Sequence, residues 1–191
     1  KNPKEKWKTT VIDQSMHLTH NLDITENKPA NRSDLFIAGK EGIKKIPVFN
    51  GRNIETPVQT IQGVENSAGE VRMGNSKSKQ PFIATIEPMH GLALVVYTGA
   101  DYKTRLVLDD QLKEGHALAT ADLLGLGYDQ VVAGWRIPNA AGKTGVKIYI
   151  PQDKSNTKWD AFWVDENGMA TEDLQVMDLN GDGKLDIVAA G

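Results

Sequence analysis

The residues best suited to metal chemistry take equivalent places along the chain. His20 and His116 each stand at the start of a short run that leads into an apolar strand, and Glu172 stands at the same place further on. Glu70 falls within one residue of the same position in a more divergent repeat of this sequence pattern. Two imidazoles and one or two carboxylates that converge on one point suit Zn²⁺ or another divalent metal, and they could equally form an acid/base group. In the alternative interpretation the histidines are only polar side chains that bond water in a central channel of the fold.

A second set of polar and aromatic residues follows the next strand of each copy. His90 lies in Glu87-Pro-Met-His-Gly91, and its counterparts are Lys40 and the pair Trp135-Arg136. An aromatic face beside charged donors suits a sugar, because the ring covers the sugar's C–H groups and the donors bond its oxygens. For Trp135, packing between sheets is the alternative. The expected roles are catalysis for His90, His116 and Arg136, and substrate binding for Trp135, Lys40 and Glu87.

One loop has the oxygen spacing of a calcium site. In the segment 178–186, Asp-Leu-Asn-Gly-Asp-Gly-Lys-Leu-Asp, oxygen side chains stand at loop positions 1, 3, 5 and 9 around a turn glycine. The expected Ca²⁺ ligands are Asp178, Asn180, Asp182, Asp186 and the carbonyl of Lys184. The alternative is a hairpin whose side chains cap their own backbone. The equivalent loop, 122–129, lacks the middle ligands and should be a plain turn, so a Ca²⁺ ion here would be structural.

The elements that must position these residues are strands. Short runs of Val, Ile, Leu, Phe and Tyr alternate with Gly, Asn, Asp and Pro, and no stretch has the period of an amphipathic helix. The chain is therefore expected to be all-β. Strands are expected near residues 7–13, 20–25, 34–39, 43–49, 57–62, 70–74, 81–87, 92–98, 104–108, 116–122, 129–135, 145–150, 159–164, 171–178 and 185–190.

The strands repeat as a unit of four, with a period of about 50 residues. The segment 116–134 is matched by 172–191 and 20–39, and more weakly by 70–86. A repeating four-stranded antiparallel unit is typical of a β-propeller blade, and the first strand of each blade lines the central channel. We therefore expect one propeller region over 1–191, with the candidate metal ligands at one mouth of its channel. Its blades would cover about 16–62, 68–109, 114–165 and a partial 169–191, with 7–13 as an outer strand.

Two interpretations of the ring stay open. The chain is either a segment of a larger propeller, or its two ends complete one blade and close a ring of four. The segment interpretation is favoured, because four-bladed rings are uncommon. A β-sandwich is a further alternative, but it does not account for the repeat.

The composition excludes several classes of protein. The chain has 191 residues, 39% of them hydrophobic and 25% charged, which is typical of a globular domain. A net charge of −3 without basic clusters argues against nucleic acid as a partner. The apolar runs are too short for membrane insertion. The absence of cysteine excludes disulfides and thiolate chemistry.

The loop 178–186, followed by Ile-Val-Ala-Ala-Gly, resembles the FG-GAP repeat, also called a VCBS-type repeat. Three clear copies and one weak copy carry this resemblance along the chain. It implies a propeller, often with seven blades, and calcium in some of the loops. Adhesion modules, bacterial surface proteins and enzyme domains all contain such repeats.

A narrower resemblance rests on the segments 84–91, 112–118, 129–136 and 168–173. Together they are similar to the propeller of aldos-2-ulose dehydratase and its bacterial relatives. Those enzymes eliminate water from oxidised sugars such as anhydrofructose and glucosone, and they use divalent metal ions. They have a full propeller, and the fungal enzyme also has cupin-like domains. The resemblance therefore implies further blades or domains beyond the ends of this chain.

Two functions from different classes follow. The first is a metal-assisted lyase, or dehydratase, that acts on a keto-sugar at the mouth of the channel. Its metal ligands would be His20, His116, Glu172 and Glu70. The second is a non-catalytic, calcium-binding FG-GAP propeller that binds carbohydrate or protein. An extracytoplasmic location, periplasmic or secreted, is expected from the calcium-type loop and from the export of the bacterial relatives.

Overall fold

The described part of the chain consists of strands and turns. The computed structural model describes residues 2–27, 32–48, 58–64 and 66–191, and it contains no helix there that could cross a membrane. The chain is all-β, as predicted. Its strands are β1 (Thr19–Asn27), β2 (Arg32–Gly39), β3 (Gly42–Val48), β4 (Gln59–Thr60), β5 (Glu70–Asn75), β6 (Pro81–Glu87), β7 (Ala93–Thr98), β8 (Thr104–Asp109), β9 (Gly115–Ala121), β10 (Gln130–Trp135), β11 (Gly145–Pro151), β12 (Trp159–Glu166), β13 (Asp173–Met177) and β14 (Asp186–Ala190).

The strands form three sheets of four and one of two. The four-stranded sheets are β1–β4, β5–β8 and β9–β12, each with its strands in chain order, and β13 pairs with β14. All pairings are antiparallel. This arrangement is that of propeller blades. No closed ring is present among the described strands.

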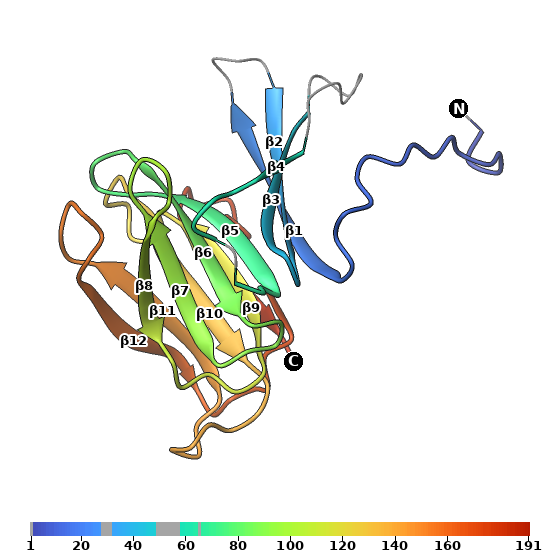
Figure 1. Cartoon of the computed structure of the whole chain (residues 1–191). Helices are drawn as coiled ribbons and strands as arrows, with labels where there is room; N and C mark the ends of the chain where they lie inside the picture. Colours follow the sequence, from blue (N-terminus) through green and yellow to red (C-terminus); the bar gives the residue numbers. More distant parts are fainter. Residues whose placement is uncertain (1, 28–31, 49–57, 65) are drawn as a thin grey trace.

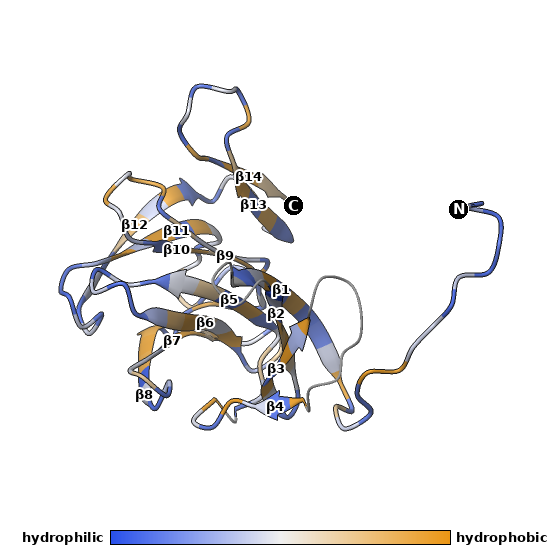
Figure 2. Cartoon of the chain, turned by 90° about the horizontal axis from the view of Figure 1, so that it is seen from above, coloured by the Kyte–Doolittle hydropathy of each residue, from blue (hydrophilic) through white to orange (hydrophobic). Residues whose placement is uncertain are grey.

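The sheets stand beside one another, with their first strands closest together. β1 contacts β5, β5 contacts β9, and β9 contacts β13. Figure 2 shows these first strands grouped together, seen from above. Equivalent positions on successive first strands therefore lie near one another, which is the condition for the candidate metal ligands to meet.

The burial of each strand follows its place in its sheet. In β10, Gln-Val-Val-Ala-Gly-Trp, every residue is buried, because neighbouring sheets cover both of its faces. In the outer strand β12, by contrast, every residue is intermediate or exposed, as expected for a strand with one face in water. Side chains from two facing sheets fill the space between them.

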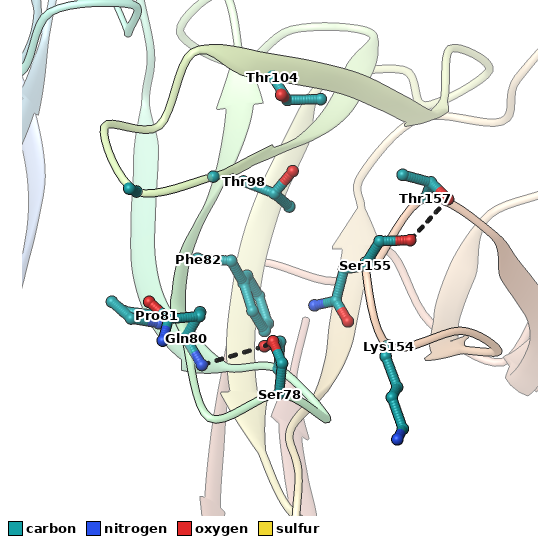
Figure 3. A pocket seen from close by; sticks show the side chains of 13 residues that line it. Ser78, Gln80, Pro81, Phe82, Thr98, Thr104, Lys154, Ser155 and Thr157 are labelled. Carbon is teal, nitrogen blue, oxygen red and sulfur yellow. Dashed lines mark hydrogen bonds between the residues drawn. The ribbon is translucent and has the colours of Figure 1, made fainter.

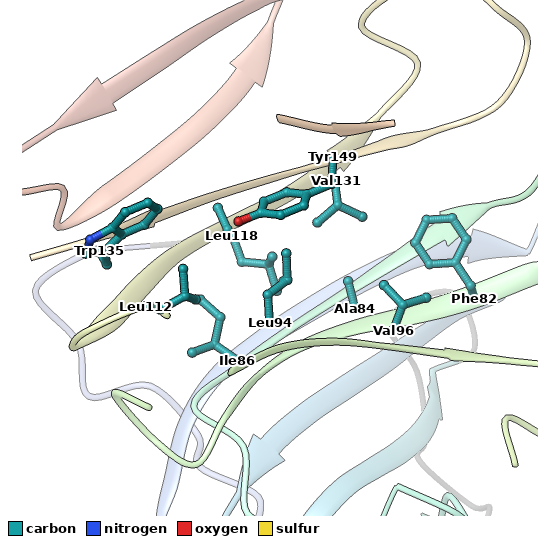
Figure 4. Packing of buried hydrophobic residues seen from close by; sticks show 11 residues of the cluster. Phe82, Ala84, Ile86, Leu94, Val96, Leu112, Leu118, Val131, Trp135 and Tyr149 are labelled. Atoms are coloured by element: carbon teal, nitrogen blue, oxygen red, sulfur yellow. The ribbon is translucent and has the colours of Figure 1, made fainter. Parts of the chain in front are cut away.

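Among the described residues, the core consists of three hydrophobic clusters, one at each junction between sheets. The largest joins the second and third sheets, and Figure 4 shows it: Ile86 and Leu94 lie on one side, and Val131 and Trp135 on the other. A second cluster joins the first two sheets, and a third joins the third sheet to β13 and β14. Because each sheet buries its faces only against its neighbours, the fold depends on stacking along the chain.

Two expected strands differ from the prediction. The segment 7–13 forms no strand, and Trp7 in it is 77% exposed. Figure 1 shows this segment running away from the sheets, so none of the described strands lies beside it to supply backbone hydrogen bonds. The expected strand 57–62 is reduced to the two residues of β4. Residue 49, at the end of the expected strand 43–49, and residue 57 lie outside the described residues.

Candidate metal centre

Three imidazoles from different parts of the chain lie together at one end of the sheets. His20 is on β1, His116 is on β9, and His90 is in the turn between β6 and β7. Their ligand atoms all lie within 4.8 Å of one another. The Nε2 atoms of His20 and His90 are 2.9 Å apart, and the ring centroids of His90 and His116 are 4.8 Å apart. The repeat therefore brings His20 and His116 together across an intervening sheet.

Backbone carbonyls of neighbouring sheets orient two of the rings. Nδ1 of His20 lies 3.0 Å from the carbonyl of Gly69, which precedes β5. Nδ1 of His116 lies 2.5 Å from the carbonyl of Glu172, which precedes β13. A carbonyl only accepts, so each Nδ1 donates, and in the neutral imidazole the lone pair is then on Nε2. A metal-binding histidine usually has its second nitrogen held in this way.

Glu70 lies behind His20 and is nearly buried. Its Oε1 is 3.2 Å from Nδ1 of His20, and its Oε2 accepts a hydrogen bond of 2.8 Å from the amide of Asn21. Arg72 is 3.5 Å from the same carboxylate. Burial raises the pKa of Glu70, and the neighbouring donors oppose this effect. A carboxylate in this place orients an imidazole and raises its basicity as a ligand.

The surroundings of the third imidazole, His90, lower its pKa. Burial lowers its pKa first, and the nearby His20, His116 and Arg136 lower it further. A neutral imidazole is the form that binds a metal. The φ angle of His90 is +53°, so the turn holds this residue in the left-handed region, and its ring lies against both of the other two.

Arg136 connects this group to two carboxylates at its edge. One amino group of its guanidinium is 3.5 Å from Nδ1 of His90 and 2.9 Å from Glu114. The other is 3.3 Å from Glu172. The side chains of Glu114 and Glu172 are 43% and 52% exposed, so their oxygens remain open to solvent. The edge of the centre thus combines one cation with two accessible carboxylates.

The structure brings together most of the residues expected at the channel mouth, but several of their contacts differ from those expected. His90, expected as an acid or base, lies within the group of possible metal ligands. Glu172 is expected to bind metal through its carboxylate. In the structure its backbone carbonyl accepts a hydrogen bond from His116, and its carboxylate accepts one from Arg136. Glu70 stands behind His20 at the Nδ1 side.

Of the three expected substrate-binding residues, two are buried and one is exposed. Trp135 is fully buried beside Trp163, with its Nε1 bonded to the carbonyl of Lys143, so its face is not open to a sugar. This is the packing role given above as the alternative. Glu87 is 5% exposed and accepts hydrogen bonds from Thr85, Tyr97 and Arg105. Lys40 is exposed on the turn after β2.

The oxygens of the loop 178–186 bond their own backbone. Asp178 accepts from the amides of Gly181, Asp182 and Gly183, and Asp186 accepts from Leu179. Asn180 and Asp182 also accept backbone N–H groups within the loop, the latter from Lys184. In the equivalent loop, Asp122 accepts from Leu126 and Gly127 in the same manner. The capped turn is therefore common to both loops, and the middle oxygens are particular to 178–186.

Two contributors to the centre were not singled out from the sequence. Glu114 bonds Arg136, and Asn21 bonds Glu70. The available signal was position alone: each lies within two residues of a cluster histidine. The sequence matches no known family in a comparison with family models, and a search of curated proteins also finds no match.

Proposed function

We propose that the chain binds one divalent transition metal ion through His20, His90 and His116. The observation that supports this best is the orientation of the rings: carbonyls of the next sheets hold Nδ1 of His20 and His116, which leaves each Nε2 facing the cluster, where that of His20 lies 2.9 Å from Nε2 of His90. His90 completes the set, and its lowered pKa favours the neutral imidazole that binds a metal. Three protein ligands are typical of catalytic rather than structural sites, because a further position stays open for substrate or water.

We further propose that this centre serves a lyase acting on keto-sugars. The substrate class rests on the resemblance to the propeller of aldos-2-ulose dehydratase, and the geometry supports the chemistry. When bound, a divalent ion would polarise a carbonyl group and so acidify the neighbouring C–H. Glu114 or Glu172, held by Arg136 and open to solvent, would accept that proton. The C–O bond at the next carbon would break as the C=C bond forms, and the hydroxide would leave as water with a proton from a general acid. The Arg136 guanidinium stays charged and is a donor for the sugar's oxygens.

The first experiment measures metal content. The purified protein is dialysed against Zn²⁺, washed, and analysed by elemental mass spectrometry, beside the variants His20→Ala, His90→Ala and His116→Ala. The matched control is His17→Ala, because the exposed His17 bonds Glu41 and lies outside the cluster. We expect about one Zn²⁺ per chain in the wild type and the control, and a large loss in the three variants. Equal zinc in the wild type and His116→Ala would contradict the proposed centre.

The second experiment tests the reaction. The metal-loaded protein is incubated with anhydrofructose and with glucosone, and elimination is followed by the absorbance of the unsaturated ketone product. We expect activity that is lost in Arg136→Gln while its zinc content is kept. If the protein binds zinc but eliminates water from neither sugar, the proposed metal centre is retained and the proposed lyase activity is contradicted.

The alternative function is a non-catalytic, calcium-binding propeller of the FG-GAP type. The observation that favours it is the turn conformation of the loop 178–186. Gly181 and Gly183 have φ angles of +78° and +84°, and the side chains of Asn180 and Asp182 are exposed. Its test is a calcium titration followed by thermal unfolding, with Asp182→Ala as the variant. Calcium stabilisation that Asp182→Ala abolishes, in a protein that binds no zinc, would favour this function.

A further inference from the structure

An open pocket of about 420 Å³ lies between the outer parts of the second and third sheets. Figure 3 shows hydroxyl groups gathered around it from three hairpin turns, with Phe82 at its centre. It has the size of a small-molecule site. Its lining residues with polar side chains are Ser76, Ser78, Gln80, Thr98, Thr104, Lys154, Ser155, Asn156 and Thr157.

This pocket is at the opposite end of the sheets from the histidines. The histidine cluster is bonded to Gly69 and Glu172, just before the first strands β5 and β13 begin. The pocket is built by the turn that follows β5 and by the turns after β7 and β11. In an antiparallel sheet with its strands in chain order, the first and third strands run in the same direction, so both finish at the same end of the sheet. The pocket is therefore separate from the proposed metal centre.

The pocket contains a buried amide that has no partner. Asn156 is 1% exposed, yet neither Oδ1 nor Nδ2 of its side chain makes a hydrogen bond in the described part of the chain. Its backbone is held firmly: the carbonyl accepts 2.8 Å from Nε1 of Trp159, and the ring of Trp159 packs edge-on against Phe82. An unpaired buried amide is costly, so a ligand that satisfies both atoms gains affinity.

The two free atoms of Asn156 restrict the chemistry of that ligand. Oδ1 needs a donor, and Nδ2 needs an acceptor. A fully ionised anion such as sulfate only accepts and would leave Oδ1 unpaired, whereas a metal cation would leave Nδ2 unpaired. Hydroxyl groups both donate and accept, and the pocket already holds hydroxyl pairs, Ser76 with Ser78 and Ser155 with Thr157.

The apolar part of the lining also suits a sugar. Pro81, Phe82 and Ala100 line the pocket beside its hydroxyl groups. A pyranose ring presents C–H faces to such groups and hydroxyls at its edge. We propose that this pocket is a binding site for a neutral sugar unit, recognised through Asn156. The proposal stands on this pocket alone and does not depend on the metal centre.

The test is a titration with glucose, maltotetraose and cellotetraose, followed by protein-observed NMR and calorimetry. We expect saturable shifts for at least one of these sugars at the turns 76–80, 98–104 and 154–157. Asn156→Gly should weaken binding about tenfold, because it removes the amide while glycine tolerates the φ of +55° at this position. Asn156→Asp, which keeps the shape and loses the donor, should also weaken binding.

Two controls separate this site from others. Asn167→Gly makes the same change at another residue of positive φ, +65°, outside the pocket, and should bind sugar as the wild type does. His116→Ala should also bind normally. Three results would overturn the proposal: no saturable shift with any of the sugars, binding unaffected by Asn156→Gly and Asn156→Asp, or inorganic phosphate binding in place of sugar. Sugar binding lost in His116→Ala alone would place the sugar at the histidines instead.

Discussion

The proton positions on the histidines decide what this centre can bind. When Nδ1 of His20 and His116 donates to a carbonyl, the lone pair of Nε2 remains for a metal. Glu70 strengthens this arrangement at His20, because its Oε1 lies 3.2 Å from the same Nδ1. The carboxylate thus supports a proposed ligand without being one.

Glu70→Gln should weaken zinc binding. Loss of the negative charge beside His20 lowers the basicity of its imidazole, and changes behind a metal ligand typically cost about 10- to 100-fold in affinity. The measurement is a competition titration of Zn²⁺ with a chelator. The control is Glu41→Gln, which removes a histidine-bonded carboxylate at His17, outside the cluster. Equal losses in both variants would show a general charge effect and contradict the specific role of Glu70.

A second residue-scale prediction concerns Asp109, which links two strands of different sheets. It accepts hydrogen bonds from Lys147 at 2.9 Å and from Tyr149 at 2.8 Å, and its side chain is 8% exposed. Burial acts to raise its pKa, but the hydrogen bonds from Lys147, Gln111 and Tyr149 outweigh it and leave the pKa below the usual value. Asp109→Asn should therefore cost about 1–3 kcal/mol of unfolding free energy, measured in urea at neutral pH.

The lowered pKa of Asp109 also fixes the sign of its pH dependence. The folded state binds this proton less readily than the unfolded state, so the stability from Asp109 is complete above the ordinary aspartate pKa of about 3.9. This stabilisation is lost as the pH falls from the ordinary aspartate pKa through the lower pKa that Asp109 has in the folded state. The difference in stability between wild type and Asp109→Asn should shrink over that range. Asp110→Asn, at the exposed neighbour, should leave the wild-type pH profile unchanged.

At the scale of elements, close packing within a sheet depends on one small residue. Gly74 on β5 lies opposite Phe82 on β6, and a methyl group at position 74 would overlap the Phe82 ring. Phe82 is 1% exposed and contacts Trp159 of the third sheet. The missing side chain at position 74 therefore lets an aromatic ring lie flat on its own sheet and reach the next one.

Gly74→Ala should destabilise the protein by about 1–3 kcal/mol, because the displaced Phe82 ring is fully packed. Urea unfolding measures this change. The double variant Gly74→Ala/Phe82→Leu should recover part of the loss relative to the sum of the single changes, because the smaller side chain leaves room for the methyl group. Strict additivity would contradict the clash as the cause.

At the scale of the whole molecule, stability should differ along the series of sheets. The central strands β6 and β10 lie between two neighbouring sheets and are almost wholly buried. β13 and β14 form a sheet of two strands, in which most residues are intermediate or exposed. Because each sheet is stabilised mainly by its neighbours, a sheet with fewer buried contacts should open more readily.

Hydrogen exchange measures this difference. Amides in β6 and β10 should exchange at least about 100-fold more slowly than amides in β13 and β14, since local opening costs less free energy where less apolar area is buried. Addition of calcium tests the proposed loop at the same time: an ion bound between β13 and β14 should slow exchange in those two strands selectively. Uniform protection over all four strands would contradict a graded stability.

The amino-acid sequence by itself determined the all-β class and the places of most strands. Runs of β-branched and aromatic residues favour strands, and Gly, Asn and Asp favour the turns between them; both effects act over a few residues. The repeat then placed His20 and His116 at the same point of their sheets. The segment 7–13 shows the limit of this reasoning, because a strand-like pattern forms a strand only where a partner strand is present.

Only the tertiary structure decided how individual side chains are used. Trp135 lies in the core, and Glu172 holds His116 through its carbonyl. The unpaired amide of Asn156 also emerges only when two sheets meet around it. The physical reason is the same in each case. The direction and burial of a side chain depend on atoms that are far away in the sequence, whereas strand and turn preferences depend on its immediate neighbours.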